Sequence, residues 1–201
     1  MKLFYSTLSP FARKVIACAI AREIDQQITL IPTSPHASPP ELLAANPLSK
    51  IPTLLTSDGL AIYDSPVICE YLDSIPDGGM KLFPRPESPA RWVVLRQQAL
   101  ADGIMDAAVL RRGEETRPGE EARDAVIERQ RQAVLRGLDL LETALPHTLL
   151  DIGSISVACA LGYLDLRFSH EDWRSGHPRL AQWFETISQE PALARSVPKP
   201  A

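Results

Sequence analysis

Strand-like segments occur only in the first 62 residues of this 201-residue chain, and every later periodic segment has helical spacing. Four short apolar runs predict strands, at residues 2–5, 28–31, 53–56 and 60–62. The turn residues Ser57-Asp58-Gly59 join the last two runs into an antiparallel hairpin. A helical pattern over residues 10–23 separates the first two runs, so these pair in parallel through a right-handed crossover.

Two further helical patterns complete this N-terminal region. A short helix follows the proline-rich loop that begins at residue 32, and Asn46-Pro47 ends it. A longer helix runs from Pro66 to about Ser74, with an apolar face. The order strand, helix, strand, helix, strand, strand, helix is the thioredoxin-like arrangement, a small α/β layer fold.

A break follows at residues 75–79, Ile-Pro-Asp-Gly-Gly, and three prolines follow it by residue 89. Helical patterns then cover residues 90–112, 120–145, 155–166 and 179–188, and a short last helix begins at Pro191. Gly113 breaks the first of these patterns, and Asp151 is the expected cap of the third, with Ser154 three residues later. We therefore expect an α/β plus all-α chain. It has a thioredoxin-like domain at residues 1–76, a linker at 77–86, and an all-helical bundle domain at 87–201.

The bulk composition excludes several classes of function. The net charge is −4 and the basic residues are not clustered, which argues against a nucleic-acid partner. No apolar run is long enough to span a bilayer, and the N-terminus has no secretory pattern. Cys18, Cys69 and Cys159 each lie in an apolar helical segment and indicate buried thiols in a reducing cytoplasm. The four histidines match no metal-site spacing, so no metal is expected.

Three helix starts carry a serine followed by proline. Ser38 has Glu41 three residues later, which predicts a capping box. Ser9 and Ser65 have apolar residues at that position, so we expect open backbone donors at these two helix starts, with Asp64 beside the second. Open donors and the helix dipole favour an anionic ligand, although each start taken alone favours simple capping.

The segment Lys50-Ile51-Pro52-Thr53 directly precedes a predicted strand. A cis bond before Pro52 would turn the Ile51 main chain outward, ready to pair with a peptide-like ligand. Only about 5–6% of such bonds are cis, so the sequence alone favours the trans form.

Together these motifs resemble the glutathione S-transferase family, closest to small bacterial members. The resemblance covers the whole chain and rests on residues 9–14 (SPFARK), 46–54 (NPLSKIPTL) and 63–68 (YDSPVI), with residues 101–106 (ADGIMD) in addition. It is specific for the family but not for a substrate. It implies a thioredoxin-like domain that binds glutathione as co-substrate, and a two-fold homodimer.

The resemblance also implies roles for individual residues. Ser9 matches the position that stabilises the glutathione thiolate, and Tyr5 is the alternative donor for that role. The remaining glutathione-binding positions are Phe11 at the mouth, Lys50 for the glycyl carboxylate, Ile51 and the cis-proline Pro52 for the cysteinyl part, and Asp64 and Ser65 for the γ-glutamyl group.

The second-substrate pocket is expected to include Phe11, Met105 and Asp106, whereas Asp102 is expected on a solvated face or in a salt bridge. The implied activity is attack of the glutathione thiolate on an electrophilic small molecule. The alternative is a non-catalytic glutathione-binding or regulatory protein of the same fold. Because position 9 is serine and not cysteine, the chemistry of mixed disulfides is disfavoured.

Overall fold

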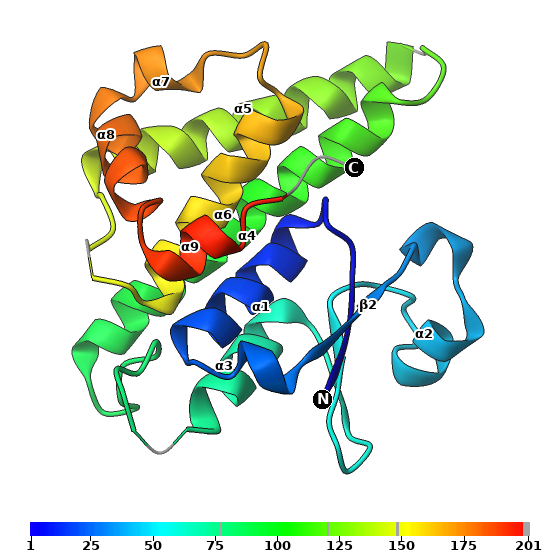
Figure 1. Cartoon of the computed structure of the whole chain (residues 1–201). Coiled ribbons are helices and arrows are strands. Elements are labelled where there is room, and N and C mark those ends of the chain that lie inside the picture. Colours follow the sequence, from blue (N-terminus) through cyan, green and yellow to red (C-terminus); the bar gives the residue numbers. More distant parts are fainter. Residues whose placement is uncertain (77, 120, 148, 199–201) are drawn as a thin grey trace. The chain divides into compact units, whose positions relative to one another are not determined.

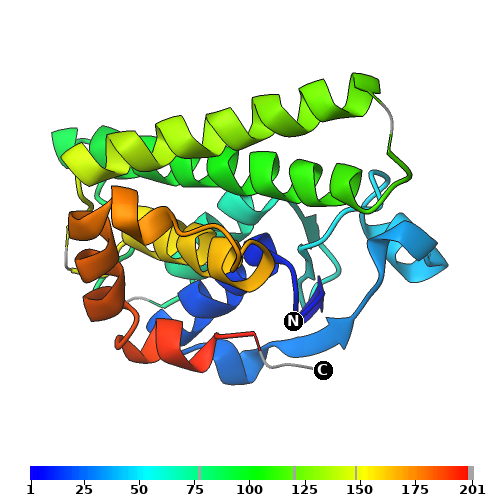
Figure 2. The ribbon, with the colours of Figure 1, turned by 90° about the horizontal axis from the view of Figure 1, so that it is seen from above.

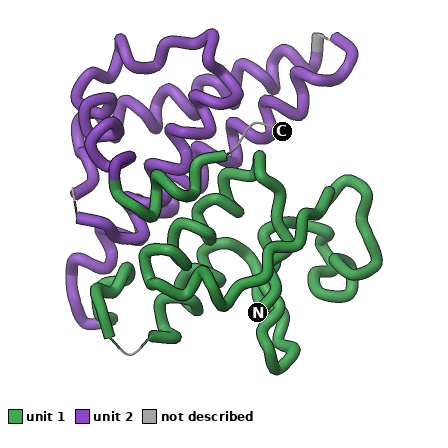
Figure 3. Tube along the Cα trace, in the orientation of Figure 1, with its two compact units in different colours: residues 1–86, 190–201 green, residues 87–189 purple. Residues whose placement is uncertain are grey.

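The structure is a computed structural model that describes residues 1–76, 78–119, 121–147 and 149–198. It divides into two compact units, residues 1–86 with 190–201 (unit 1) and residues 87–189 (unit 2), coloured separately in Figure 3. The C-terminal segment therefore groups with unit 1, whereas the sequence pattern placed it in the helical domain. The reason is that helix α9 (Pro191–Arg195) packs on helix α1 (Pro10–Ala21), and Arg195 forms a 2.6 Å ion pair with Asp25.

Unit 1 is built on a four-stranded mixed sheet with the strand order β2-β1-β3-β4. The strands are β1 (Lys2–Tyr5), β2 (Thr29–Pro32), β3 (Thr53–Leu55) and β4 (Ala61–Ile62). β1 pairs with β2 in parallel, and β3 runs antiparallel to both β1 and β4. The predicted parallel pair, the hairpin and the thioredoxin-like arrangement are confirmed.

The helices of unit 1 are α1, α2 (Pro40–Ala45), α3 (Ser65–Ser74) and α9, with single 3-10 turns at Asp25–Gln27 and Pro35–Ala37. α1 and α3 pack against each other, as Figure 1 shows. α1 is buried almost all round because α3 and α9 both cover it. Its middle is rich in small residues such as Ala17 and Ala19, which allow this close packing.

The predicted capping box of α2 is wrong. Pro39 is the N-cap residue, and no side chain caps this helix. Ser38 lies one residue too early and adopts the left-handed conformation, with φ +43°. Its hydroxyl donates to the Pro35 carbonyl at 3.4 Å and meets the Ser49 hydroxyl at 3.0 Å, so tertiary contacts replace the local cap.

Unit 2 contains helices joined by turns and loops, and no strand occurs among its described residues. Its helices are α4 (Pro89–Glu115), α5 (Glu121–Thr143), α6 (Ile152–Arg167), α7 (Trp173–Gly176) and α8 (Pro178–Ile187). The long helices α4 and α5 lie side by side, and α6 packs on α4 (Figures 1 and 2). α6 is buried on nearly all sides, as its apolar sequence predicts.

Two local predictions in unit 2 have opposite outcomes. Asp151 and Ser154 form the expected reciprocal cap at the start of α6, with the Ser154 N–H donating to the Asp151 carboxylate at 2.7 Å. Gly113 was expected to end α4, but the helix continues to Glu115. An ion pair between Arg111 and Glu115 spans this glycine and offsets its weak helix propensity.

Among the helices of the described chain, none combines the length and apolar character that a membrane span needs.

Candidate functional site

The strand register brings the predicted site segments to one end of the sheet. Because β3 is antiparallel to both β1 and β4, it begins where those two strands end. The predicted residues Ile51, Pro52, Asp64 and Ser65 lie within three residues of these strand ends, and Ser9 lies four residues after the end of β1. Unit 1 alone therefore collects every residue of the proposed sulfur, cysteinyl and γ-glutamyl contacts.

Ser9 is the N-cap residue of α1 and is half-buried. Its Oγ accepts a hydrogen bond from the Ala12 N–H at 3.2 Å. This bond uses a lone pair of the hydroxyl and leaves its O–H hydrogen able to donate. No described residue accepts from that O–H, so the Ser9 hydroxyl is available to an anion at this helix start.

The start of α3 supplies further donors. Asp64 is the N-cap residue, and no side chain caps the helix. The first intrahelical bond runs from the Ile68 N–H to the Asp64 carbonyl at 3.0 Å. The N–H groups of Ser65 and Val67 therefore have no partner within the helix. Ser65 is buried and Asp64 is exposed, so a hydroxyl, open N–H groups and a carboxylate lie on one short segment.

Ile51 stands outside the sheet. The peptide bond between Ile51 and Pro52 is cis, contrary to the base rate that favoured trans. β3 begins at Thr53, so Ile51 has no ladder partner, and no described residue forms a hydrogen bond with its main chain. Its N–H and C=O are both open to a ligand.

Tyr5, Phe11 and Lys50 lie around the same end of the sheet. Tyr5 is the last residue of β1 and is half-buried, with its carbonyl accepting from the Thr33 N–H at 2.8 Å. Phe11 is half-buried in the first turn of α1, and Lys50 is exposed directly before Ile51.

The residues expected for the second substrate are divided between the units. Phe11 belongs to unit 1, whereas Met105 and Asp106 belong to α4 of unit 2. The Met105 side chain has no exposed surface, and Asp106 beside it is exposed. Their grouping into one pocket stays a prediction.

Two residues that hold the Ile51 loop were missed as site residues. Asn46 was interpreted only as a helix stop, and Thr53 only as part of a strand, but both side chains form hydrogen bonds to this loop. A local signal existed for Asn46, because an asparagine ahead of proline often bonds to the backbone two residues on. Its Oδ1 accepts from the Leu48 N–H at 3.0 Å.

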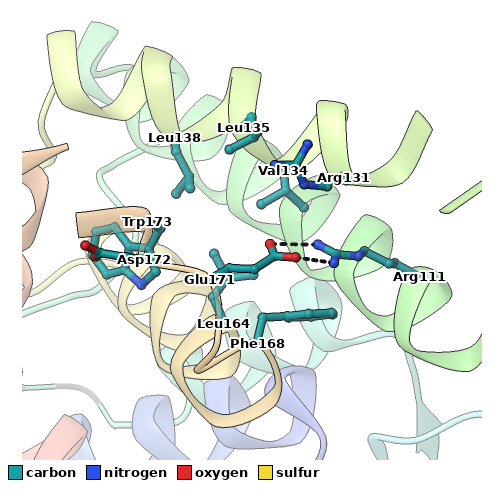
Figure 4. Close-up of a pocket in the computed structure, with 10 residues that line it drawn as sticks. All are labelled: Arg111, Arg131, Val134, Leu135, Leu138, Leu164, Phe168, Glu171, Asp172 and Trp173. Atoms are coloured by element: carbon teal, nitrogen blue, oxygen red, sulfur yellow. Dashed lines mark hydrogen bonds and ion pairs between the residues drawn. The ribbon is translucent and has the colours of Figure 1, made fainter. Parts of the chain in front are cut away.

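Unit 2 contains a cavity of about 200 Å³ that none of the predicted residues lines. Figure 4 shows aliphatic side chains of α5 and α6 on two sides of it, with Phe168 and Trp173 completing the apolar wall. Glu171 and Arg111 form a two-pronged ion pair at its edge. These two residues lie 60 positions apart, so no sequence pattern joins them.

The Arg111–Glu171 pair shifts both groups toward their charged forms. Hydrogen bonding from Arg111 lowers the pKa of Glu171 below its usual value of 4.5, and the same bond raises the pKa of Arg111. The Arg111 guanidinium also lies 4.4 Å from the centre of the Phe168 ring. The Arg111 guanidinium forms ion pairs with both Glu115 and Glu171. It therefore has a structural role, linking α4 to the segment that follows α6 within unit 2.

Within the described ranges, no group of three or more His, Cys, Asp or Glu side chains is arranged to hold a metal ion. Cys18, Cys69 and Cys159 are all described, buried and not joined by disulfides.

Comparison with protein families gives two matches. Residues 8–75 match the family model of the glutathione S-transferase N-terminal domain, and residues 124–186 match that of the C-terminal domain. The N-terminal match contains Ser9, Ile51, Asp64 and Ser65.

Individual relatives match over the full length. The chain is 33% identical over 207 residues to the uncharacterized GST-like protein YibF of Escherichia coli K12, with complete coverage of both chains. A glutathione transferase family member from Pseudomonas fluorescens Pf-5, solved with bound glutathione, is 40% identical with a TM-score of 0.92, covering 99% of each chain. A glutathione S-transferase from Methylobacillus flagellatus KT with bound glutathione is 37% identical with a TM-score of 0.88, covering 98% of this chain and 99% of the other.

Proposed function

This chain belongs to the glutathione S-transferase family, and we propose that it binds glutathione at the end of the unit 1 sheet and transfers it to an electrophilic small molecule. The observation that carries the proposal is the arrangement of one sheet end. There a hydroxyl able to donate, an unpaired main chain at Ile51 and an open helix start at Ser65 come together. Two relatives of the same fold, both with more than a third of their residues identical, hold glutathione.

The proposed contacts follow from the chemistry of the tripeptide. The exposed Asp64 carboxylate pairs with the γ-glutamyl ammonium, and the Ser65 hydroxyl with the open N–H groups of α3 binds the adjacent carboxylate. The Ile51 main chain pairs with the cysteinyl residue, beside the cis Pro52. Lys50 reaches the glycyl carboxylate, and Phe11 lines the mouth.

The proposed role of Ser9 is to donate a hydrogen bond to the glutathione sulfur and so lower the pKa of its thiol. A free thiol has a pKa near 8.5, and a hydrogen bond to a charged group contributes roughly 1.5–3 kcal/mol. Since one pH unit corresponds to about 1.36 kcal/mol, the Ser9 hydroxyl lowers the thiol pKa by roughly 1–2 units. The start of α1 adds a smaller effect of the same sign. Together the two effects lower the thiol pKa by roughly 1.5–3 units, so the thiolate is the main form at neutral pH.

The reaction needs no covalent bond to the protein. The thiolate sulfur donates its electron pair to an electrophilic carbon and forms a thioether, and the leaving group departs with the electron pair of the broken bond. Binding and orientation of the two substrates provide the rest of the rate enhancement. Phe11 in unit 1 and the exposed Asp106 in unit 2 are the proposed contacts of the electrophile, whereas the Met105 side chain, which has no exposed surface, is not in a position to touch it.

We also infer a two-fold homodimer in the cytoplasm, where glutathione is abundant and the three buried cysteines stay reduced. Large apolar side chains are exposed on both units. Trp92 on α4 is 70% exposed, and Leu60 and Val67 in unit 1 are 57% and 52% exposed. Light scattering after gel filtration tests this, with twice the 22.1 kDa chain mass expected.

The proposed function is tested by two measurements on the full chain. Calorimetric titration measures glutathione binding, and absorbance measures conjugation of 1-chloro-2,4-dinitrobenzene. Binding with conjugation supports the proposal. Binding without turnover of any electrophile in a broad panel supports the non-catalytic alternative, and failure to bind glutathione overturns both.

A further inference from the structure

The side chain of Asn46 lies at the centre of the loop that carries Ile51. It is 1% exposed. Its Nδ2 donates to the Lys50 carbonyl at 3.2 Å and to the Thr53 Oγ1 at 3.0 Å, and its Oδ1 accepts from the Leu48 N–H at 3.0 Å. One buried amide group, at the first residue of the loop 46–53, therefore holds both the middle of the loop and its last residue.

Thr53 completes this arrangement. It is fully buried, and its Oγ1 donates to the same Lys50 carbonyl at 2.8 Å. The Lys50 carbonyl therefore accepts two hydrogen bonds from side chains that cannot reach water. Because the peptide unit is planar and the Lys50–Ile51 bond is trans, a fixed Lys50 C=O also fixes the opposite direction of the Ile51 N–H.

We propose that Asn46 and Thr53 are positioning residues, which aim the Ile51 N–H at the cysteinyl part of glutathione. This inference rests on the proposed function. Neither side chain touches the ligand, because both are buried and both are occupied by the loop itself. Their effect is to pre-organise a main-chain donor, so that binding does not have to order it.

The chain offers a matched control for this idea. Thr56 is also a buried threonine of unit 1, 6% exposed, and its hydroxyl also holds a loop. Its hydroxyl contacts the Asp58 carboxylate and the Leu60 carbonyl and accepts from the Leu60 N–H at 2.9 Å, all in the hairpin between β3 and β4, and it makes no bond to Lys50 or Ile51. Replacing either threonine by valine removes one buried hydroxyl with little change of shape.

The experiment compares glutathione binding by calorimetry in wild type, Thr53→Val, Thr53→Ser and Thr56→Val, with melting curves to establish folding. We expect Thr53→Val to raise the Kd by about tenfold, because the Lys50 carbonyl is then held by the Asn46 side chain alone. Thr53→Ser keeps the hydroxyl, so its Kd for glutathione should stay within about twofold of the wild-type value. The Kd of Thr56→Val should also stay within about twofold, even when its Tm falls as much as that of Thr53→Val. In steady-state kinetics, Thr53→Val raises KM for glutathione and leaves KM for the electrophile unchanged.

Asn46→Asp is the second variant, because it keeps the size of the side chain and removes both Nδ2 donors. We expect a similar loss of glutathione affinity in the folded protein. Wild-type binding together with unchanged affinity in folded Thr53→Val or Asn46→Asp overturns this inference and leaves the proposed function standing. Equal losses in Thr53→Val and Thr56→Val overturn it as well, since they indicate a general effect of stability. Absence of wild-type binding overturns the proposed function and this inference with it.

Discussion

The guanidinium of Arg22 lies 3.0 Å from the carboxylate of Asp73, measured from Nε to Oδ1, in an ion pair that is almost completely buried. The pair links the residue after α1 to the last turn of α3. Both partners also hold the segment that follows α3, since Arg22 donates to the carbonyls of Pro76, Gly78 and Met80, and Asp73 accepts from the N–H groups of Leu82 and Phe83.

Replacing Arg22 by methionine should strongly destabilise the protein. The change leaves the Asp73 carboxylate buried without its cation, which costs about 3–5 kcal/mol of the free energy of unfolding. Urea denaturation followed by circular dichroism measures this loss. The control is Arg195→Ala, which breaks an exposed pair with Asp25 and should cost about 0–1 kcal/mol. Equal losses in the two variants would contradict the importance of the buried pair.

The cap of α6 predicts different results for two substitutions of Asp151. Asp151→Ala removes the acceptor of the Ser154 N–H and should cost about 1–2 kcal/mol, whereas Asp151→Asn keeps an acceptor and should cost much less. Burial raises the pKa of Asp151 above its usual value of 3.8. The wild type therefore loses stability as pH rises through the raised pKa, and Asp151→Asn lacks this loss.

Unfolding free energies of wild type and Asp151→Asn at about pH 3 and about pH 7 check this prediction. Relative to wild type, the asparagine variant should have a larger free energy of unfolding at the higher pH than at the lower pH. A shift in favour of aspartate would show that the cap stabilises the carboxylate more than burial penalises it.

Glu171 should show the opposite dependence on pH. Hydrogen bonding from Arg111 lowers the pKa of Glu171, so its contribution is present above the usual value of 4.5 and is lost as pH falls through the lowered pKa. Glu171→Gln should therefore destabilise the protein by about 1 kcal/mol at neutral pH, a modest value because Glu171 is partly exposed to solvent. The same denaturation series measures it. A cost that stays constant down to acid pH would contradict the ion-pair account.

The arrangement of strands and helices could be predicted because its signals are local. The hairpin depends on Ser57-Asp58-Gly59 and the cap of α6 on Asp151 and Ser154, all close in sequence. The capping box at Ser38 failed because this residue lies one position before the N-cap, where its hydroxyl donates to the Pro35 carbonyl and accepts from the Ser49 hydroxyl. Local pattern also placed the end of α4 at Gly113, where an ion pair across one turn extends the helix.

The predicted site residues of unit 1 meet at one sheet end because strand register follows from the hairpin and the crossover. What could not be predicted depends on pairs far apart in the chain. The contact of α9 with α1 and the pair of Arg111 with Glu171 join residues separated by more than 50 positions, for which sequence spacing carries no information.

The central claim is that Ser9, and not Tyr5, holds the glutathione thiolate. The most direct test is an ultraviolet titration of thiolate absorbance with glutathione bound to wild type, Ser9→Ala and Tyr5→Phe. We predict that the bound thiol titrates about 1.5–3 pH units below the free value of about 8.5 in wild type and in Tyr5→Phe, and returns toward that value in Ser9→Ala. A low thiol pKa that survives in Ser9→Ala and is lost in Tyr5→Phe would contradict the account.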